Sequence, residues 1–189
     1  MQELVAFLKG FHSIDHAVIE EYASRWNEFS IGKKQVMCAE GEVEKYLYYV
    51  KEGVQKSYFL HKNKEHIIAF AYPNSFSGMI DSFITQTPSR YYLETITESK
   101  FLRISFEQHE RMISQERQLE TLFRKMSERF LYGLVHRLHE VMALTVEERF
   151  RAFSSRSAHL LQIIPQKDIA SYLNIDATNF SKLINRIKI

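Results

Sequence analysis

The chain has 189 residues, 45% hydrophobic and 25% charged, which is typical of a soluble globular protein with one domain or two small ones. Its one cysteine, Cys38, excludes an internal disulfide and an intrachain four-cysteine zinc or iron–sulfur site. There is no basic start followed by an apolar run, and no apolar stretch approaches ~18 residues, so we expect neither a signal peptide nor a membrane span and predict a cytoplasmic protein.

The first half of the chain changes from a helical to a strand pattern. Apolar residues at helical spacing predict helices over residues 2–9 and about 14–27, with Trp26 as a core anchor. Turn residues then separate short runs rich in β-branched and aromatic side chains. These runs predict strands at Phe29–Ile31, Gln35–Cys38, Tyr46–Lys51, Val54–His61, Glu65–Tyr72, Tyr91–Ile96 and Phe101–Ile104. Many short strands at this spacing favour an antiparallel sandwich or a barrel-like roll.

The helical period returns at Ser105, which with Gln108 has the form of a capping box. We predict one long helix over about 107–144. Its apolar positions recur every three or four residues: Leu119, Phe123, Met126, Phe130, Leu134, Leu138 and Val141. Such a stripe either packs on its own sheet or pairs with its copy in a second subunit as a short coiled coil. We predict the second arrangement, a homodimer with these seven residues in the interface.

A second capping box, Thr145 with Glu148, predicts that a new helix begins there. We therefore expect two domains, 1–144 and 145–189, and a helix near 147–158 in the second. Two short helices follow between Pro165 and Ile187, separated by a turn at Asn174, a residue type that tolerates positive φ. This frame has the form of a helix-turn-helix.

The last of these helices is amphipathic. Phe180, Leu183, Ile184 and Ile187 share one face, and Asp176 precedes the helix as a cap. The outer face carries hydrogen-bonding side chains and no acidic one, which suits base edges and phosphates. The predicted DNA-contacting residues are Gln166, Thr178, Asn179, Ser181, Lys182, Asn185 and Arg186. The alternative is an ordinary helical hairpin with a solvated polar face. From Thr145 onward seven Lys/Arg stand against four Asp/Glu, so the basic excess lies with this helix pair.

The order of elements resembles the cyclic-AMP receptor protein / fumarate-nitrate regulator (Crp/Fnr) family. Residues 29–36 with Gly41-Glu42 are similar to the opening strands and first turn of that family's roll, and residues 46–53 to the next strand and its glycine turn. Residues 76–90 fall where the family keeps its phosphate-binding cassette, and residues 147–150 resemble the start of its DNA-binding domain. The resemblance implies an α+β fold with a cyclic-nucleotide-binding-like β-roll, a long dimerisation helix and a C-terminal helix-turn-helix. The β-hairpin wing that usually follows is not evident before Ile189.

The resemblance also locates a ligand pocket, with Gly78, Met79, Ser89, Arg90, Leu134 and Val135 as candidate residues. Met79 stands where nucleotide-binding members have a glutamate for the ribose. Ser89 stands where they have an arginine for the phosphate, with Arg90 one place late. The polar pair that meets the base falls near Leu134 and Val135. A buried phosphate would lack its charge partner, so cyclic AMP is not expected to be the ligand. The pocket either holds something apolar or aromatic or is a filled structural relic, and the nearby aromatic residues Phe70, Tyr72, Tyr91 and Tyr92 favour a filled core.

No arrangement of residues suggests catalysis, a cofactor or a metal site, so we predict no enzyme. The prediction is a sequence-specific transcription regulator that binds double-stranded DNA as a homodimer on an inverted repeat. RNA polymerase is a further partner that the family resemblance suggests, and any small-molecule effector is unknown. The rival interpretation is a protein-interaction or small-molecule-binding module with a vestigial helix-turn-helix.

Overall fold

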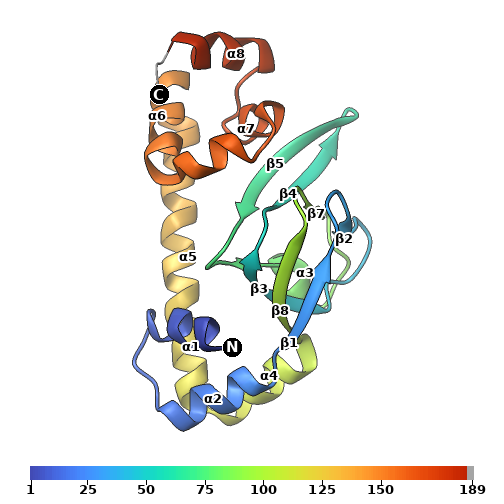
Figure 1. Cartoon of the computed structure of the whole chain (residues 1–189), viewed down its shortest axis with the longest axis vertical. Coiled ribbons are helices and arrows are strands. Elements are labelled where there is room, and N and C mark those ends of the chain that lie inside the picture. Colours follow the sequence, from blue (N-terminus) through green and yellow to red (C-terminus); the bar gives the residue numbers. More distant parts are fainter. Residues whose placement is uncertain (187–189) are drawn as a thin grey trace. The chain divides into compact units, whose positions relative to one another are not determined.

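The computed structural model describes residues 1–186, except for the side chain of Asn185. The helices are α1 Gln2–Lys9, α2 His16–Ser24, α3 Ile80–Thr85, α4 Phe106–Gln115, α5 Arg117–Ala143, α6 Val146–Ser157, the 3₁₀ helix η1 Ala158–Gln162, α7 Gln166–Tyr172 and α8 Ala177–Arg186 (Figure 1). The strands are β1 Asn27–Ile31, β2 Val36–Cys38, β3 Tyr46–Glu52, β4 Gln55–His61, β5 Lys64–Ala71, β6 Phe76–Ser77, β7 Tyr92–Thr95 and β8 Ser99–Ser105. No helix within the described residues has the length and hydropathy needed to cross a bilayer.

The strands form two four-stranded sheets, in the orders β1-β8-β3-β6 and β2-β7-β4-β5. The β4–β5 hairpin turns at Lys62 and Asn63, which both have positive φ and so fit a two-residue hairpin turn. Gly53 has a φ of +91° between β3 and β4, where a Cβ would lie 2.4 Å from the carbonyl oxygen of Glu98. The chain approaches itself too closely there for any other residue.

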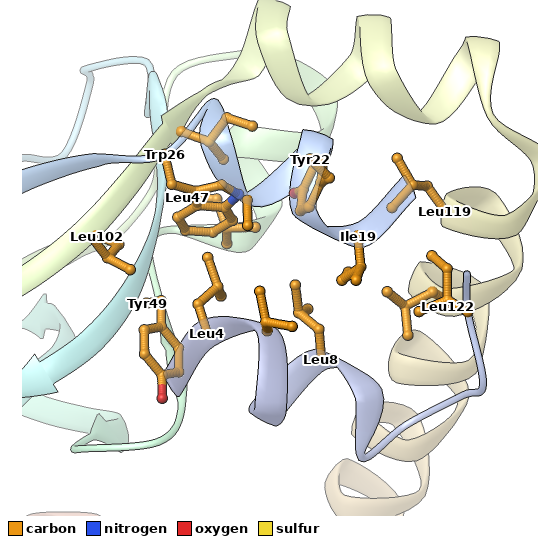
Figure 2. Packing of buried hydrophobic residues seen from close by; sticks show 14 of the residues in the cluster. Leu4, Leu8, Ile19, Tyr22, Trp26, Leu47, Tyr49, Leu102, Leu119 and Leu122 are labelled. Atoms are coloured by element: carbon orange, nitrogen blue, oxygen red, sulfur yellow. The ribbon is translucent and has the colours of Figure 1, made fainter. Parts of the chain in front are cut away.

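The main core lies between one face of the first sheet and the helices around it (Figure 2). Residues from α1, α2 and the beginning of α5 meet the sheet residues Leu47, Tyr49, Leu102 and Ile104, all of which are buried. Trp26 is 3% exposed within this core, so the prediction that it is a core anchor is confirmed.

The long helix predicted over 107–144 is wrong in one respect, because the chain breaks it at Glu116. That residue has extended backbone angles (φ −125°, ψ 104°), and its carboxylate accepts a hydrogen bond from the amide of Gln118 at 3.2 Å. The break lets both α4 and α5 face the core, where His109 of α4 packs its ring 4.7 Å from that of Phe123 of α5. A straight helix could not present both segments to the same core.

The chain forms two compact units. The first comprises residues 1–57 and 70–131, and the second residues 58–69 and 132–189. This division differs from the boundary expected at residue 144, because the β4–β5 hairpin and the second half of α5 both bond to the C-terminal helices. The Ser171 hydroxyl accepts from the amide of Ile67 and donates to the carbonyl of Glu65, both at 3.0 Å.

Candidate functional site

The helix pair α7–α8 turns at Asn174, whose φ of +53° confirms the turn residue predicted from the sequence. The amide of Ile175 donates to the carbonyl of Ala170 at 2.9 Å, which closes the end of α7. Ala170 is 1% exposed, so its small side chain lies within the packing of the pair.

Asp176 caps α8, as predicted. Its carboxylate oxygen accepts from the amides of Thr178 at 2.9 Å and Asn179 at 3.3 Å. Phe180 and Leu183 are buried, and the Phe180 ring meets Phe150 of α6 edge to face at 5.6 Å. These contacts fix which side of α8 faces solvent.

The exposed side of α8 carries most of the residues predicted to contact DNA. Thr178, Asn179, Ser181, Lys182 and Arg186 are all exposed there, and Gln166 is exposed at the first position of α7. The Asn185 side chain and Ile187 lie outside the described residues. The surface holds hydroxyl, amide, ammonium and guanidinium groups, and no carboxylate from α8.

Three arginines that the sequence analysis did not single out hold this helix pair in the second unit. Arg149 is buried and donates to the carbonyls of Val141 at 3.2 Å and Asn174 at 3.5 Å, so it ties the turn to the end of α5. Arg137 donates to the carbonyl of Tyr172 and lies 4.0 Å above its ring. Arg156 pairs with Glu140 of α5. Helical spacing alone gives no signal for such contacts, because each partner belongs to another element.

The cassette residues form local structure and do not line the pocket described below. Gly78 has a φ of +141°, and Met79 is buried against Cys38 and Leu93. The Ser89 hydroxyl accepts from the amide of Tyr91 and donates to its carbonyl, both at 3.0 Å. Arg90 is exposed. Cys38 packs with Met79 as a small apolar side chain, and burial and nearby carboxylates raise the pKa of its thiol to about 12.

Leu134 and Val135, the remaining pocket candidates, are exposed on the second half of α5 and belong to the second unit. None of the six candidates lines the pocket, so this part of the sequence prediction does not describe it.

A pocket of about 630 Å³ lies within the first unit, lined by β1, β2, β3, β8 and residues 42–45. Its lining mixes apolar and aromatic side chains with four charged ones, Glu42, Glu44, Lys45 and Arg103 of β8. Glu44 also lines it and is 3% exposed; burial raises the pKa of this carboxyl to about 7. Its two oxygens accept from the amides of Tyr46 at 3.2 Å and Met79 at 3.3 Å.

The predicted interface stripe on α5 divides into two parts. Leu119 is fully buried, and Phe123 and Met126 pack half-buried against the same core of the first unit. Leu119 therefore belongs to its own core and offers no surface to a dimer interface, whereas Phe123 and Met126 keep part of their surface exposed, and their place in an interface stays a prediction. Phe130, Leu134 and Leu138 are 48–59% exposed, and Val141 is half-buried.

Residues 28–116 match the family "Cyclic nucleotide-binding domain". No curated protein matches this chain. FixK2 from Bradyrhizobium japonicum aligns with a TM-score of 0.74 at 19% identity, over 85% of this chain and 83% of that one. The catabolite activator protein of Thermus thermophilus aligns with a TM-score of 0.59 at 16% identity, over 95% and 85% of the two chains.

The regulator CLP of Xanthomonas campestris, described as responsive to c-di-GMP, aligns with a TM-score of 0.65 at 17% identity and covers 91% of each chain. At these identities the alignments show the fold. The chain thus has a mixed α/β fold built on a cyclic-nucleotide-binding-type domain, with a long helix following it. Its structural neighbours are regulators of the Crp/Fnr family, which confirms the resemblance noted in the sequence.

Proposed function

We propose that this protein is a transcription regulator that binds a specific DNA sequence as a homodimer through α8, a helix-turn-helix reading helix. The observation that carries the proposal is the orientation of α8, whose buried back and capped start leave its polar, acid-free side in solvent. The first turn of such a helix enters the major groove, where Asn179 suits adenine and Lys182 suits guanine.

The dimer is supported by the exposed half of the α5 stripe. Phe130, Leu134, Leu138 and Met142 recur every four residues along one helix, with Val135 beside Leu134, and all five are 48–77% exposed. Monomeric proteins rarely leave a continuous apolar stripe of this kind in water, and pairing with a second copy would cover it. Two copies of α8 about 34 Å apart would read an inverted repeat.

The experiment is selection of bound DNA from a random pool by the purified protein, followed by titration of two variants. Lys182→Ala should weaken binding to the selected site by about 1–3 kcal/mol and reduce the base preference at one position of that site. Arg186→Ala should weaken binding to all sequences equally and flatten the salt dependence. Lys33→Ala removes an exposed lysine of the first unit and serves as the matched control. If both α8 variants bind as the wild type does, α8 does not read DNA and the interaction-module interpretation replaces this one.

Light scattering tests the dimer separately. Phe130→Glu should produce a monomer, whereas Ile84→Glu, which changes an exposed apolar residue of α3 in the same way, should leave the dimer intact. A wild-type protein that is monomeric at micromolar concentration would refute the dimer.

A contact with RNA polymerase is part of the regulator proposal, and it would be measured by transcription from a promoter that carries the selected site.

The proposal includes a sensor-like domain that does not bind cyclic AMP or cyclic GMP. Met79 is buried among apolar side chains, and the Ser89 hydroxyl bonds to the backbone of Tyr91, so neither offers a charge to a ribose or a phosphate. Calorimetry should give no saturable binding; a dissociation constant below about 10 μM, equivalent to roughly 7 kcal/mol, would contradict this.

A further inference from the structure

We propose that the pocket of the first unit binds a small organic monoanion with an aromatic or branched apolar body, and that Arg103 is its anion contact. The pocket belongs to the first unit alone, so the inference does not depend on α8 reading DNA. It concerns residues of β1, β3 and β8, and none of the cassette positions that hold a cyclic nucleotide in related proteins.

Arg103 is held between two aromatic rings. Its guanidinium carbon lies 4.1 Å from the centre of the Phe29 ring and 4.3 Å from that of Tyr46. Strand pairing causes this arrangement, because β1 and β3 are the two neighbours of β8 and flank Arg103 on either side. Cation–π contacts of this kind fix the plane of the guanidinium and leave its N–H edge for hydrogen bonds.

The charge of Arg103 is not neutralised by an ion pair within residues 1–186. Its polar neighbour there is the hydroxyl of Tyr48, whose pKa is raised by burial and partly lowered again by the arginine. A half-buried guanidinium with a fixed orientation and no carboxylate partner is suited to a planar anionic group such as a carboxylate or sulfonate.

The rest of the pocket defines the body of the ligand. Ile31, Met37 and the rings of Phe29 and Tyr46 provide apolar walls, and a volume of about 630 Å³ lies within the range of small-molecule sites. These walls would gain little from a fully hydrated inorganic ion. They would bury an aromatic or branched hydrocarbon group and stabilise it by the hydrophobic effect.

The carboxyls at the pocket restrict the charge of the ligand. Glu42 and Glu44 both line it, and the oxygens of Glu44 are already engaged by backbone amides. Lys45 also lines the pocket, so two cations stand against the two carboxyls. A dianionic phosphate would add two more negative charges to this set and would be repelled by the acids. A monoanion satisfies Arg103 with less repulsion, and the chemistry therefore points to a carboxylic or sulfonic acid.

The probe for the test is 8-anilinonaphthalene-1-sulfonate, an aromatic sulfonate whose fluorescence rises in apolar surroundings. The full-length protein should bind it saturably, and Arg103→Met should weaken binding at least tenfold. Arg90→Met removes an exposed arginine of the same unit outside the pocket and should bind the probe as the wild type does. The uncharged analogue N-phenyl-1-naphthylamine should lose less than threefold with Arg103→Met, because it makes no ion pair.

The exposed stripe on α5 is another surface to which this probe could adhere, so a second variant locates the site. Ile31→Trp fills the pocket and should abolish the saturable phase, whereas Phe130→Glu on α5 should preserve it. Equal affinity of wild type and Arg103→Met for the sulfonate would overturn the proposal. So would equal losses for the charged and uncharged probes, or a saturable phase that survives Ile31→Trp. Should Arg103→Met fail to fold, as judged by circular dichroism, Ile31→Trp and the pair of probes still decide the outcome.

Discussion

A buried histidine in the first unit leads to a sharp prediction about stability and pH. His109 of α4 is 7% exposed and lies among the rings of Phe83, Phe123 and Tyr22. Its Nδ1 is 2.8 Å from the Tyr22 hydroxyl. Burial lowers its pKa from 6.5 to about 4, because the charged imidazolium would lose its hydration there.

The sign of the effect follows from the two protonation equilibria. Between about pH 4 and pH 6.5 the unfolded chain binds a proton at His109 that the folded chain does not, so the free energy of unfolding falls as the pH is lowered through this range. The full shift is equivalent to roughly 3 kcal/mol, and lowering the pH from about 7.5 to about 5 should cost about 2 kcal/mol.

Glu44 acts in the opposite direction. Burial raises its pKa from 4.5 to about 7, so the folded chain binds the extra proton and this group stabilises the fold as the pH falls from about 7 to about 4.5. Its effect between about pH 7.5 and pH 5 is also about 2 kcal/mol. The two groups should therefore nearly cancel in the wild type.

The assay is urea unfolding at pH 5 and pH 7.5, at one protein concentration, of the wild type, His109→Asn, Glu44→Gln and the double variant. Asparagine keeps an oxygen for the Tyr22 hydroxyl but does not titrate. The quantity compared is the free energy of unfolding at pH 5 minus that at pH 7.5. This difference should be about 2 kcal/mol larger for His109→Asn than for the wild type, and about as much smaller for Glu44→Gln. The double variant should return to the wild-type dependence. If His109→Asn keeps the pH dependence of the wild type, His109 is not held neutral by burial and the reasoning fails.

Two further changes test local structure. Gly53→Ala should destabilise the protein by about 2–4 kcal/mol in chemical denaturation, because the added Cβ would lie 2.4 Å from a carbonyl oxygen at a φ of +91°. Gly32→Ala, where the nearest atom is a flexible side-chain carbon at 3.9 Å, should change stability by less than about 0.5 kcal/mol. Thr145→Ala should lower the free energy of unfolding by about 1 kcal/mol, because the Thr145 hydroxyl accepts from the amide of Glu148 at the start of α6. Thr145→Ser should keep most of this stability. If Thr145→Ala is as stable as the wild type, this cap contributes nothing.

The sequence predicted those features of the fold that depend on local chemistry. Helical spacing located α1 to the residue, and two capping hydroxyls, Ser105 and Thr145, accept from the predicted amides. The positive φ of Asn174 and the cap at Asp176 also follow from what these side chains can do on their own. Local rules of this kind need no knowledge of distant partners.

Other features depend on contacts between segments far apart in the chain, and local patterns do not encode such contacts. The apolar spacing of Leu119, Phe123 and Met126 is the same as that of Phe130 and Leu134, so spacing could not tell which part of α5 packs on its own core. The short strand β6 carries too few residues for any period and exists because Tyr48 and Tyr49 of β3 pair with it. Length and periodicity are equally silent about the break at Glu116.

The pocket of the first unit also depends on contacts between distant segments, which local sequence patterns do not encode. The family resemblance indicated the cassette residues instead, and these lie outside the pocket. Alternation along β8 places Phe101 and Arg103 on the side opposite Leu102, and a lone arginine in such a run resembles an ordinary edge residue. Its environment is set by Phe29 and Tyr46, which lie 74 and 57 positions earlier in the numbering and become its neighbours only when β1 and β3 join β8. Two rings that cover a guanidinium remove water from its faces without removing its charge, so they raise the strength of any ion pair made at its edge. The chemistry of the pocket is therefore a property of the sheet, and the cassette residues from which the ligand was judged contribute nothing to its lining.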